Sequence, residues 1–453
     1  MDKLYGIHFY ISIINFDDII LDEEEKTKGV THAIHALDTF FSCIESYGKK
    51  TCEDLVVEKI TGARLHIYVT GPIESAFPAV KRVSLYAYQL AGYINTGIPK
   101  YKTLSDFRIN IGAAFSQFYD FEFTSKEGFS ELTSIGYAAN YAAKLQALSG
   151  EKMFSISENI YDELPDSDQK WFETVFEKSI QKYGQDKYYT APLNTICLSE
   201  KIPDADLLAA RDYANKDDLQ DIEFSEVRAP LNFNQLRRTK CKKLYGIPVF
   251  ADVRGYTSKF EDDDSNLEEM KDQTQKILEA MYQISTSYGG VHVQFQGDRE
   301  FSLYHNIPAQ YVNGIKQPEK KCYKAAVLAA MRMIDSVKPL KAHIGVGEAF
   351  GPLFATKIGA RGEKDNILLG KTVLQADTME DRYADEDQVV ITPEVYYGLK
   401  NEDDGLSREF TRKGEYYVAT IGYSDYTRKE SIRQHEINTL KRAYNGAWKD
   451  DRQ

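Results

Sequence analysis

A segment that occurs twice constrains this sequence more than any other feature. KLYGI stands at residues 3–7 and again at 243–247, and four further pairs of short motifs follow in the same order. These pairs are SYG at 46–48 and 287–289, IGAAF at 111–115 with VGEAF at 346–350, ISENIY at 156–161 with ITPEVY at 391–396, and KYY at 187–189 with EYY at 415–417. An ordered set of matches indicates an internal duplication. The chain is therefore expected to contain two copies of one fold.

The same order of predicted elements occurs in each half. A buried strand is followed by an amphipathic helix, a hairpin and a second helix, and further strands with a short helix close the unit. The strands are predicted near 4–14 and 244–253, the first helices near 30–47 and 266–287, and the second helices near 76–95 and 321–337. Because strands and helices mix without strict βαβ alternation, the pattern predicts an α+β fold with helices covering a sheet.

Two segments lie outside this pattern. The polar residues 192–242, which include PDAD and NKDDLQD, are typical of a linker with some helix. Residues near 428–448 are predicted to form one exposed helix. The expected organisation is a first domain at 1–191, a linker at 192–242, a second domain at 243–425 and a C-terminal helix at 426–453.

Composition and charge exclude several classes of function. No apolar run approaches the roughly 18 residues of a membrane span, and the N-terminal apolar run lacks the cleavage site of a signal peptide. The net charge of -13 disfavours binding to long nucleic acids, which need a basic surface. It is compatible with a small anionic substrate if metal ions bridge the charge. We therefore expect a soluble, cytoplasmic protein with neither a membrane nor a nucleic acid polymer as partner.

The cysteines are Cys43, Cys52, Cys197, Cys241 and Cys322. Their number is odd, and no CxxC or CxxH spacing occurs. This pattern predicts reduced thiols and argues against a zinc site or a disulfide framework.

Two carboxylates in the second half are candidates for metal binding. Asp252 ends the first predicted strand, in FADVRGYT at 250–257, and Asp298 lies in the turn of GDRE at 297–300. If the first and third strands lie side by side, the two acids meet at one edge and can hold two hard cations. Taken singly, each is more often a turn or capping aspartate.

The first half lacks both acids. Ser12 occupies the position of Asp252, and Ala63 occupies that of Asp298. Two unrelated structural aspartates need not disappear together, whereas the two ligands of a metal site would. The comparison of the halves therefore favours the metal site.

These motifs resemble the class III nucleotidyl cyclases, in which a strand ends in F-x-D-[IV]-x-G-[FY]-[ST] and a G-D hairpin follows. The resemblance covers both halves, nearly the whole chain outside the linker and the tail. It implies two tandem cyclase-like domains, each a mostly antiparallel sheet flanked by helices, that form a pseudo-heterodimer. It also implies two divalent cations, Mn²⁺ or Mg²⁺, at Asp252, Val253 and Asp298, and phosphate contacts through Thr257.

The family builds its active site between two domains. The domain without the metal acids supplies an Asn and, four residues later, an Arg, in a helical G-x-x-x-N-x-x-x-R pattern. The first half has Gly136, Asn140 and Lys144 in these places, and the second half has Leu374 and Thr378 at the last two. The halves are thus complementary, which implies one composite site with Asn140 and Lys144 as catalytic residues. Lys144 keeps the charge of the family's arginine but not its planar fork, and the alternative is a solvated Asn–Lys pair on a helix face.

The same resemblance implies that Lys59 and Thr133 recognise the base. Adenylate-forming members place a Lys three residues before the hairpin Gly and an Asp three residues before the Gly of the Asn helix; here these are Lys59 and Thr133. Of the two residues that recognise adenine in the family, the lysine is present and the aspartate is not. The Glu and Cys that recognise guanine are both absent. The pattern is closer to the pyrimidine cyclases of bacterial anti-phage (Pycsar) systems, and two units in one chain resemble their cytidylate-forming branch. Alternatively, Lys59 is an ordinary surface lysine.

The resemblance implies an enzyme that turns CTP, with UTP as the second candidate, into a 3′,5′-cyclic nucleotide and pyrophosphate. Its diffusible product would act on a downstream effector in anti-phage defence. Lys182 or Lys187 would reach the terminal phosphates, and spacing does not choose between them. Two alternatives stay open, namely an adenylate cyclase with a relaxed base pocket and a catalytically silent nucleotide sensor.

Overall fold

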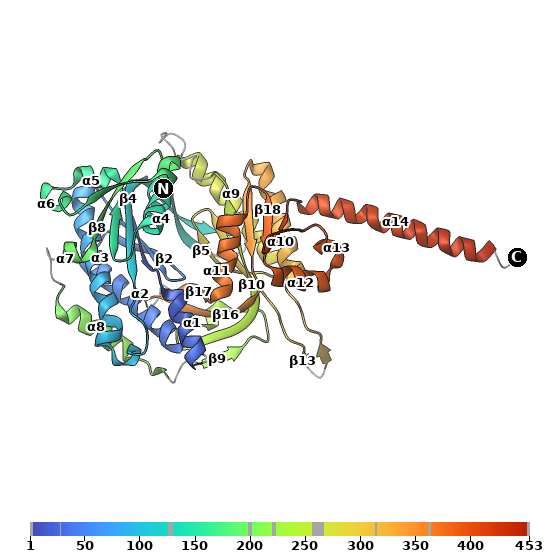
Figure 1. The fold of residues 1–453 in the computed structure, drawn as a ribbon, viewed down its shortest axis with the longest axis horizontal. Coiled ribbons are helices and arrows are strands. Elements are labelled where there is room, and N and C mark those ends of the chain that lie inside the picture. The colour runs from blue at the N-terminus through green and yellow to red at the C-terminus, as the bar shows by residue number, and fades with distance from the viewer. Residues whose placement is uncertain are drawn as a thin grey trace.

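The fold is seen in a computed structural model, which describes residues 3–27, 29–125, 130–197, 202–219, 223–255, 267–312, 315–360 and 364–450. Two large sheets stand side by side, each covered by helices (Figure 1). The predicted α+β fold, with helices covering a sheet in each half, is confirmed.

The first sheet has the strand order β2-β3-β1-β4-β6-β8-β7, with β5 paired to β4. Its strands are β1 (Leu4–Ile13), β2 (Leu55–Thr61), β3 (Arg64–Thr70), β4 (Ile109–Thr124), β5 (Ser130–Gly136), β6 (Met153–Ile156), β7 (Glu173–Phe176) and β8 (Lys187–Pro192). The helices of this half are α1 (Phe16–Thr27), α2 (Thr31–Thr51), α3 (Ile73–Gly97), α4 (Tyr137–Leu148), α5 (Glu158–Glu163), α6 (Asp166–Gln169) and α7 (Leu193–Cys197). Within the sheet, β4 and β6 are parallel, and the other pairs are antiparallel.

The second sheet has the order β11-β12-β10-β15-β18-β20-β19, which repeats the first strand for strand. Its strands are β10 (Lys240–Val253), β11 (Val291–Gln296), β12 (Arg299–His305), β15 (Ile344–Glu348), β16 (Gly351–Ile358), β17 (Asp365–Leu369), β18 (Gln388–Ile391), β19 (Thr411–Lys413) and β20 (Tyr416–Ala419). The helices are α9 (Leu267–Ser287), α10 (Tyr323–Val337), α11 (Lys371–Thr378), α12 (Pro393–Glu402) and α13 (Asp404–Ser407). A small hairpin of β13 (Gln310–Val312) and β14 (Ile315–Gln317) stands apart from the sheet. The duplication predicted from short motifs is therefore a duplication of topology.

Alternation along β1 explains how each sheet separates a core from a second face. Ile7, Phe9 and Ile11 are fully buried in the core beneath the helices. Because successive side chains of a strand point to opposite faces, Tyr10 and Ser12 lie on the other face. The equivalent alternation in β10 places Asp252 on that same second face of its own sheet.

The segment 192–242, predicted to be a linker with some helix, contains helices and a strand. Its helix α8 (Asp204–Ala214) buries Ala210 and Ala214 in the core of the first half. Its strand β9 (Glu223–Glu226) pairs in parallel with β10. Arg238, itself buried, places Nη1 2.7 Å from Oδ2 of Asp38. The segment thus belongs to the folded body and fixes the first half to the second.

The C-terminal helix α14 (Tyr423–Asp450) projects from the second half (Figure 1). Its first turns pack on the body, where Tyr426 is buried and Arg332 of α10 lies 5.3 Å from the ring of Tyr423. The predicted exposed helix is thus present and starts a few residues earlier than expected.

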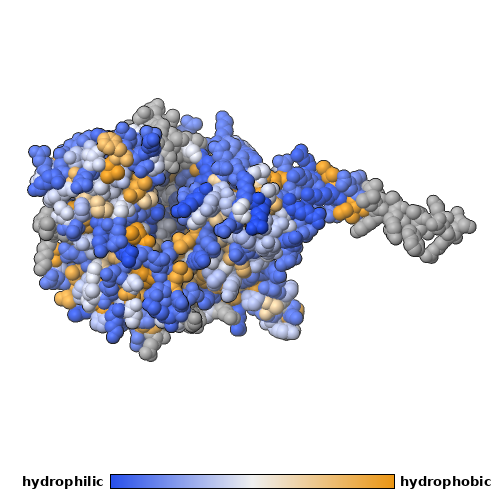
Figure 2. Space-filling model, viewed as in Figure 1, coloured by the Kyte–Doolittle hydropathy of each residue, from blue (hydrophilic) through white to orange (hydrophobic). Residues whose placement is uncertain are grey.

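Polar residues cover most of the face shown in Figure 2, and apolar residues occur there in small scattered groups. Within the described ranges, no helix combines the length and the apolar character needed to cross a bilayer. Cys43, Cys52, Cys241 and Cys322 are free thiols.

Candidate active site

Asp252 and Asp298 come together at the end of two neighbouring strands. The predicted pairing of the first and third strands of the second half is confirmed, because β10 and β12 are antiparallel neighbours. Asp252 lies opposite Arg299 in this register, and Asp298 is the residue directly before Arg299. The side chain of Asp252 is 29% exposed, and Asp298 is buried. Val253 ends β10 beside this pair.

The two carboxylates disfavour each other's ionisation. Burial raises the pKa of Asp298 well above its usual range, and the charge of Asp252 raises it further. Burial also raises the pKa of Asp252, against the opposing effect of Arg299 and Arg254. Paired, desolvated carboxylates of this kind gain most from a bound divalent cation, which favours both charged forms. The donor set therefore fits a hard metal ion.

The nearby arginines are engaged with other groups. Arg254 reaches Asp252 only at 3.4 Å, and its Nη2 donates to the backbone carbonyl of Glu380 at 2.8 Å. Arg299 places Nη2 2.7 Å from Oδ1 of Asp377. Both cations are thus held at the rim of the pair, and neither makes a short ion pair with its carboxylates.

Asn140 of the first half lies beside the turn of the second half that carries Asp298. A Cβ atom placed on Gly297 would be 3.7 Å from Oδ1 of Asn140. Gly297 has a φ of 69°, a left-handed conformation that glycine adopts without strain. Asn140 is on α4, which begins directly after β5. The structure therefore brings the predicted asparagine of one half to the predicted metal acid of the other.

Lys144 is one helical turn further along α4, so it shares a helix face with Asn140. It is half-buried, and its charge helps lower the pKa of Glu177, which is lowered mainly by the backbone N–H of Ser179. Within the part of the chain that the structure describes, neither Asn140 nor Lys144 makes a side-chain hydrogen bond. Both polar groups are available to a ligand.

Lys59 is not a surface lysine, which removes that alternative. It is 4% exposed, and its Nζ lies 2.5 Å from Oε1 of Glu131 and 2.5 Å from the backbone oxygen of Phe295 in the second half. Burial alone would lower the pKa of Lys59, but Glu131 and Glu58 raise it above its usual value. Thr133 is fully buried, and its hydroxyl lacks a partner among the described residues.

The sequence reasoning missed Glu131, which joins the two halves. Its Oε1 accepts the backbone N–H of Phe295 at 2.9 Å, and the equivalent Asp365 of the second half accepts the N–H of Ile60 at 2.7 Å. Burial raises the pKa of Asp365 to about 7. Glu131 and Asp365 precede Gly136 and Gly370 by the same spacing, so an alignment of the halves contained the signal.

His292 belongs to the same junction. Its Nε2 is 3.0 Å from Oε2 of Glu131, and its Nδ1 is 2.9 Å from Oε2 of Glu300. Burial disfavours the charged ring, yet the two carboxylates raise the pKa of His292 to about 9. The ring is therefore a buried cation between two acids at neutral pH.

The proposed phosphate contacts are only partly described. Lys187 pairs with Glu158, with Nζ 2.6 Å from Oε1. Lys182 lies in a 3₁₀ helix at Lys178–Tyr183. Thr257 lies outside the described residues.

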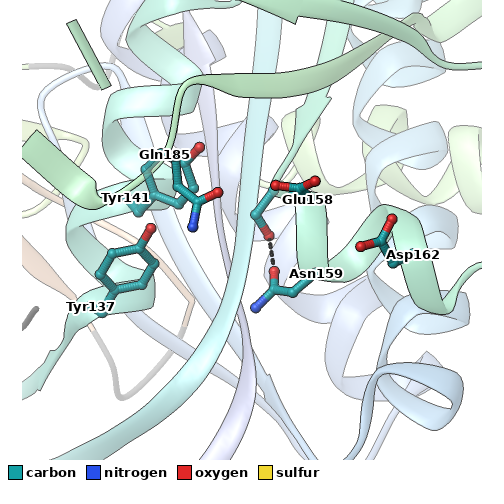
Figure 3. Close-up of a pocket in the computed structure, with 7 residues that line it drawn as sticks. Tyr137, Tyr141, Glu158, Asn159, Asp162 and Gln185 are labelled. Carbon is teal, nitrogen blue, oxygen red and sulfur yellow. Dashed lines mark hydrogen bonds between the residues drawn. The ribbon is translucent and has the colours of Figure 1, made fainter. Parts of the chain in front are cut away.

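A pocket of about 260 Å³ occurs elsewhere in the first half (Figure 3). Tyr137 and Tyr141 of α4 face Glu158, Asn159 and Asp162 across it. None of the residues predicted for catalysis, metal binding or base recognition lines this pocket. The pocket lining therefore does not include the residues of the predicted composite site.

No protein-family model matches the sequence, and no curated protein matches it either. Among solved structures, the chain is similar to a class III adenylyl cyclase-like ATP-binding protein from Pseudomonas aeruginosa. The two share 17% identity, with a TM-score of 0.71, over 94% of this chain and 90% of the other. This likeness extends through both halves and shows the fold.

Two further matches cover about one domain. The adenylyl cyclase CyaB from P. aeruginosa is 22% identical and covers 39% of this chain and 93% of its own, with a TM-score of 0.32. The guanylate cyclase domain of RhGC from Catenaria anguillulae, in complex with GTP, is 18% identical and covers 39% and 96%, with a TM-score of 0.31.

Proposed function

We propose that this chain of two cyclase-like halves is a nucleotidyl cyclase with a single composite active site. It converts CTP, with UTP as the second candidate substrate, into a 3′,5′-cyclic nucleotide and pyrophosphate. The observation that carries the proposal is the position of Asn140, from the first half, beside the Gly297–Asp298 turn of the second. A site divided in this way needs both halves, which explains why the acids are kept in only one of them.

Asp252, Asp298 and the backbone at Val253 would hold the divalent cations. Carboxylate and carbonyl oxygens suit Mg²⁺ and Mn²⁺. When bound, such ions lower the pKa of the attacking hydroxyl and offset the charge of the triphosphate. Burial and the repulsion of Asp252, which together raise the pKa of Asp298, support this assignment.

The other side chains position the substrate and offset its charge. In the reaction the ribose 3′-hydroxyl releases its proton to water and its oxygen bonds to the α-phosphorus, while the bond between that phosphorus and the pyrophosphate oxygen breaks and pyrophosphate leaves. The unpaired amide of Asn140 orients the ribose, and Lys144 offsets the charge that grows on the transferring phosphoryl group. Because lysine lacks the planar fork of arginine, it acts as a point charge.

The choice of base rests on Lys59 and Thr133. An ammonium group has three hydrogen-bond donors, and Lys59 directs two of them to Glu131 and Phe295. The third is left for a carbonyl oxygen such as O2 of a pyrimidine. The unpaired hydroxyl of Thr133 can donate or accept, which suits cytosine with its N3 acceptor and amino donor. The role in anti-phage defence, through a diffusible product and an effector, rests on the resemblance alone.

A second candidate function is nucleotide binding without cyclisation. Lys144 departs from the family's arginine, and the similar protein from P. aeruginosa is described as an ATP-binding protein. In this case Asp252 and Asp298 would bind a metal–nucleotide complex that is not converted.

The test is to incubate the purified protein with each of the four nucleoside triphosphates and Mn²⁺, and to separate the products by chromatography. We expect cyclic CMP, or cyclic UMP, with equimolar pyrophosphate. Cyclic AMP as the main product would favour the relaxed adenylate cyclase. Calorimetric binding of a nucleotide with no product from any of the four would favour the silent sensor and overturn the proposal.

A further inference from the structure

Two histidines and a glutamate form a buried cluster in the first half. Nδ1 of His8 lies 3.0 Å from Nε2 of His66, and Nδ1 of His66 lies 3.1 Å from Oε2 of Glu58. The exposed fractions are 0% for His8, 4% for His66 and 9% for Glu58. One potential ligand atom from each residue lies within 4.8 Å of the others. Three metal-binding side chains therefore converge in the interior.

The fold does not require these polar groups. Pairing by KLYGI places His8 opposite Pro248, and the pairing of β3 with β12 places His66 opposite Phe301. Both hairpins carry a bulge at the same point, where Glu58 of the first half corresponds to Val293 of the second.

The second half is apolar at all of these positions. Val293 and Phe301 belong to an apolar core cluster, and Pro248 is buried. Three buried positions that are apolar in one copy have become His, Glu and His in the other. A buried polar group costs free energy unless it is satisfied, so this joint replacement points to a ligand.

Neighbouring groups fix the orientation of the cluster. The backbone N–H of Ser134 donates to Oε1 of Glu58 at 3.1 Å, and the Ser134 hydroxyl donates to Oε2. The ring of Tyr10 stacks on His66 with centroids 4.2 Å apart and an interplanar angle of 7°. Such outer contacts are typical of metal ligands, because they hold each donor in place. Ser134 corresponds to Leu368 in the apolar core of the second half, so this support is also specific to the first half.

The size and chemistry of the cluster restrict the ligand. The three side chains are nine-tenths or more buried, which admits an ion and not a nucleobase. Two imidazoles with one carboxylate are a donor set typical of Zn²⁺. Zn–N distances of about 2.0–2.1 Å in a tetrahedron separate two nitrogens by about 3.3 Å, close to the 3.0 Å between His8 and His66.

We propose that His8, Glu58 and His66 bind one divalent transition-metal ion of the Zn²⁺ type, separate from the cations at Asp252 and Asp298. The ion ties β1, β2 and β3 of the first half together, and through Ser134 it also holds β5. Cysteine spacing carries no information on such a site, because its ligands are histidine and glutamate.

His292 shows that a buried histidine between carboxylates does not by itself form a metal site. Glu131 and Glu300 lie at the two ring nitrogens of His292, and among the described residues these three side chains do not bring one ligand atom each within 4.8 Å of one another. His8, Glu58 and His66 do meet this distance.

The experiment uses the full chain carrying Asp252→Asn and Asp298→Asn, so that the hard-cation site is removed. The protein is stripped with EDTA, exposed to Zn²⁺, desalted and analysed by mass spectrometry for metal. We expect about one zinc per chain, as for a structural site, and visible absorption bands of a tetrahedral ion after loading with Co²⁺. His66→Phe and Glu58→Val, which copy the second half, should lose the metal. His343→Ala, at an exposed histidine, should keep it.

Two outcomes overturn the proposal. One is that the chain with intact His8, Glu58 and His66 retains no zinc and shows no rise in melting temperature with Zn²⁺. This readout does not depend on whether the variants fold. The other is that a folded His66→Phe protein retains as much zinc as its parent. Either result would identify the cluster as a buried hydrogen-bonded chain without an ion.

Discussion

Asn140 of the first half lies beside Gly297 of the second, so that a Cβ on that glycine would be 3.7 Å from its Oδ1. Gly297 precedes Asp298, whose pKa is raised by burial and by Asp252. A group suited to orient a sugar and two groups suited to hold metal are thus contributed by different copies of one fold. The second set of equivalent positions, Ser12 and Ala63, has lost this chemistry.

Replacement of Asp298 should separate activity from stability. Asp298→Asn removes a negative charge that would hold the metal ion. The barrier to cyclisation should therefore rise by several kcal/mol, and the rate should fall on the order of a thousandfold. The metal-free protein should become more stable, because a neutral amide ends the repulsion with Asp252. Product formation and the melting temperature in EDTA measure the two effects. Ser12→Ala, at the mirror position, should change neither, and a fully active Asp298→Asn protein would contradict the metal assignment.

Asn140 and Lys144 should act in the transition state. Asn140→Ala should lower kcat by about 10²–10³-fold, the usual loss for one positioned donor, while the Kd for nucleotide stays nearly unchanged. Lys144→Ala should lower kcat, and Lys144→Arg should keep or raise it because the charge remains. Thr378→Ala is the matched control on α11. A weaker Kd with an unchanged kcat would show that these residues only bind substrate.

Base choice should respond to Thr133. Thr133→Asp introduces the carboxylate of the adenine pattern, so kcat/KM for ATP relative to CTP should rise. A hydrogen bond gained or lost in a closed pocket is worth about 1–3 kcal/mol, which is roughly 5- to 150-fold in selectivity. The measurement is kcat/KM for all four nucleoside triphosphates. Unchanged ratios would place base recognition elsewhere.

Lys59 should affect both base choice and folding. Lys59→Ala should reduce the differences in kcat/KM among the four nucleoside triphosphates. It also leaves the carboxylate of Glu131 buried without its cation. Breaking a buried ion pair in this way costs about 3–5 kcal/mol. The free energy of unfolding should therefore be measured beside the selectivity. A Lys59→Ala protein as stable as the wild type would show that the Glu131 contact contributes little.

Glu348 should make stability fall as the pH rises. It is fully buried, neither of its oxygens has a hydrogen-bond partner among the described residues, and burial raises its pKa to about 8. Between its unfolded pKa of about 4.3 and this value, the folded state keeps a proton that the unfolded chain has released. The free energy of unfolding therefore falls across this window, by at most about 5 kcal/mol at 1.36 kcal/mol per pKa unit.

The variant that tests this is Glu348→Gln, which cannot ionise. Urea unfolding at pH 5, 6.5 and 8 should show its stability rising relative to the wild type as the pH increases. The first half carries Ala113 at the equivalent position, so Glu348→Ala is a second, fold-compatible variant. A constant difference between variant and wild type at all three pH values would rule out the raised pKa.

The sequence was informative where local rules decide. Local patterns predict that Asp252 lies at the end of a strand and that Asp298 lies in a turn. The duplication predicts two sheets of the same topology. Contacts that depend on register were not accessible. The bulge that brings Glu58 toward His66, and the partner Glu131 of Lys59, follow from how strands pair across the sheet and between halves. The alignment of the halves gave partial evidence for both residues. Glu131 aligns with another acid, Asp365, and Glu58 aligns with an apolar residue, Val293.

The measurement that tests the composite site most directly is the rate of pyrophosphate release with CTP and Mn²⁺, compared among wild type, Asp298→Asn and Asn140→Ala. The account predicts release coupled to cyclic nucleotide in the wild type, and a large loss in each variant although the two residues lie in different halves. Wild-type activity that survives Asn140→Ala undiminished, while Asp298→Asn abolishes it, would show that the second half works alone and would contradict the composite site.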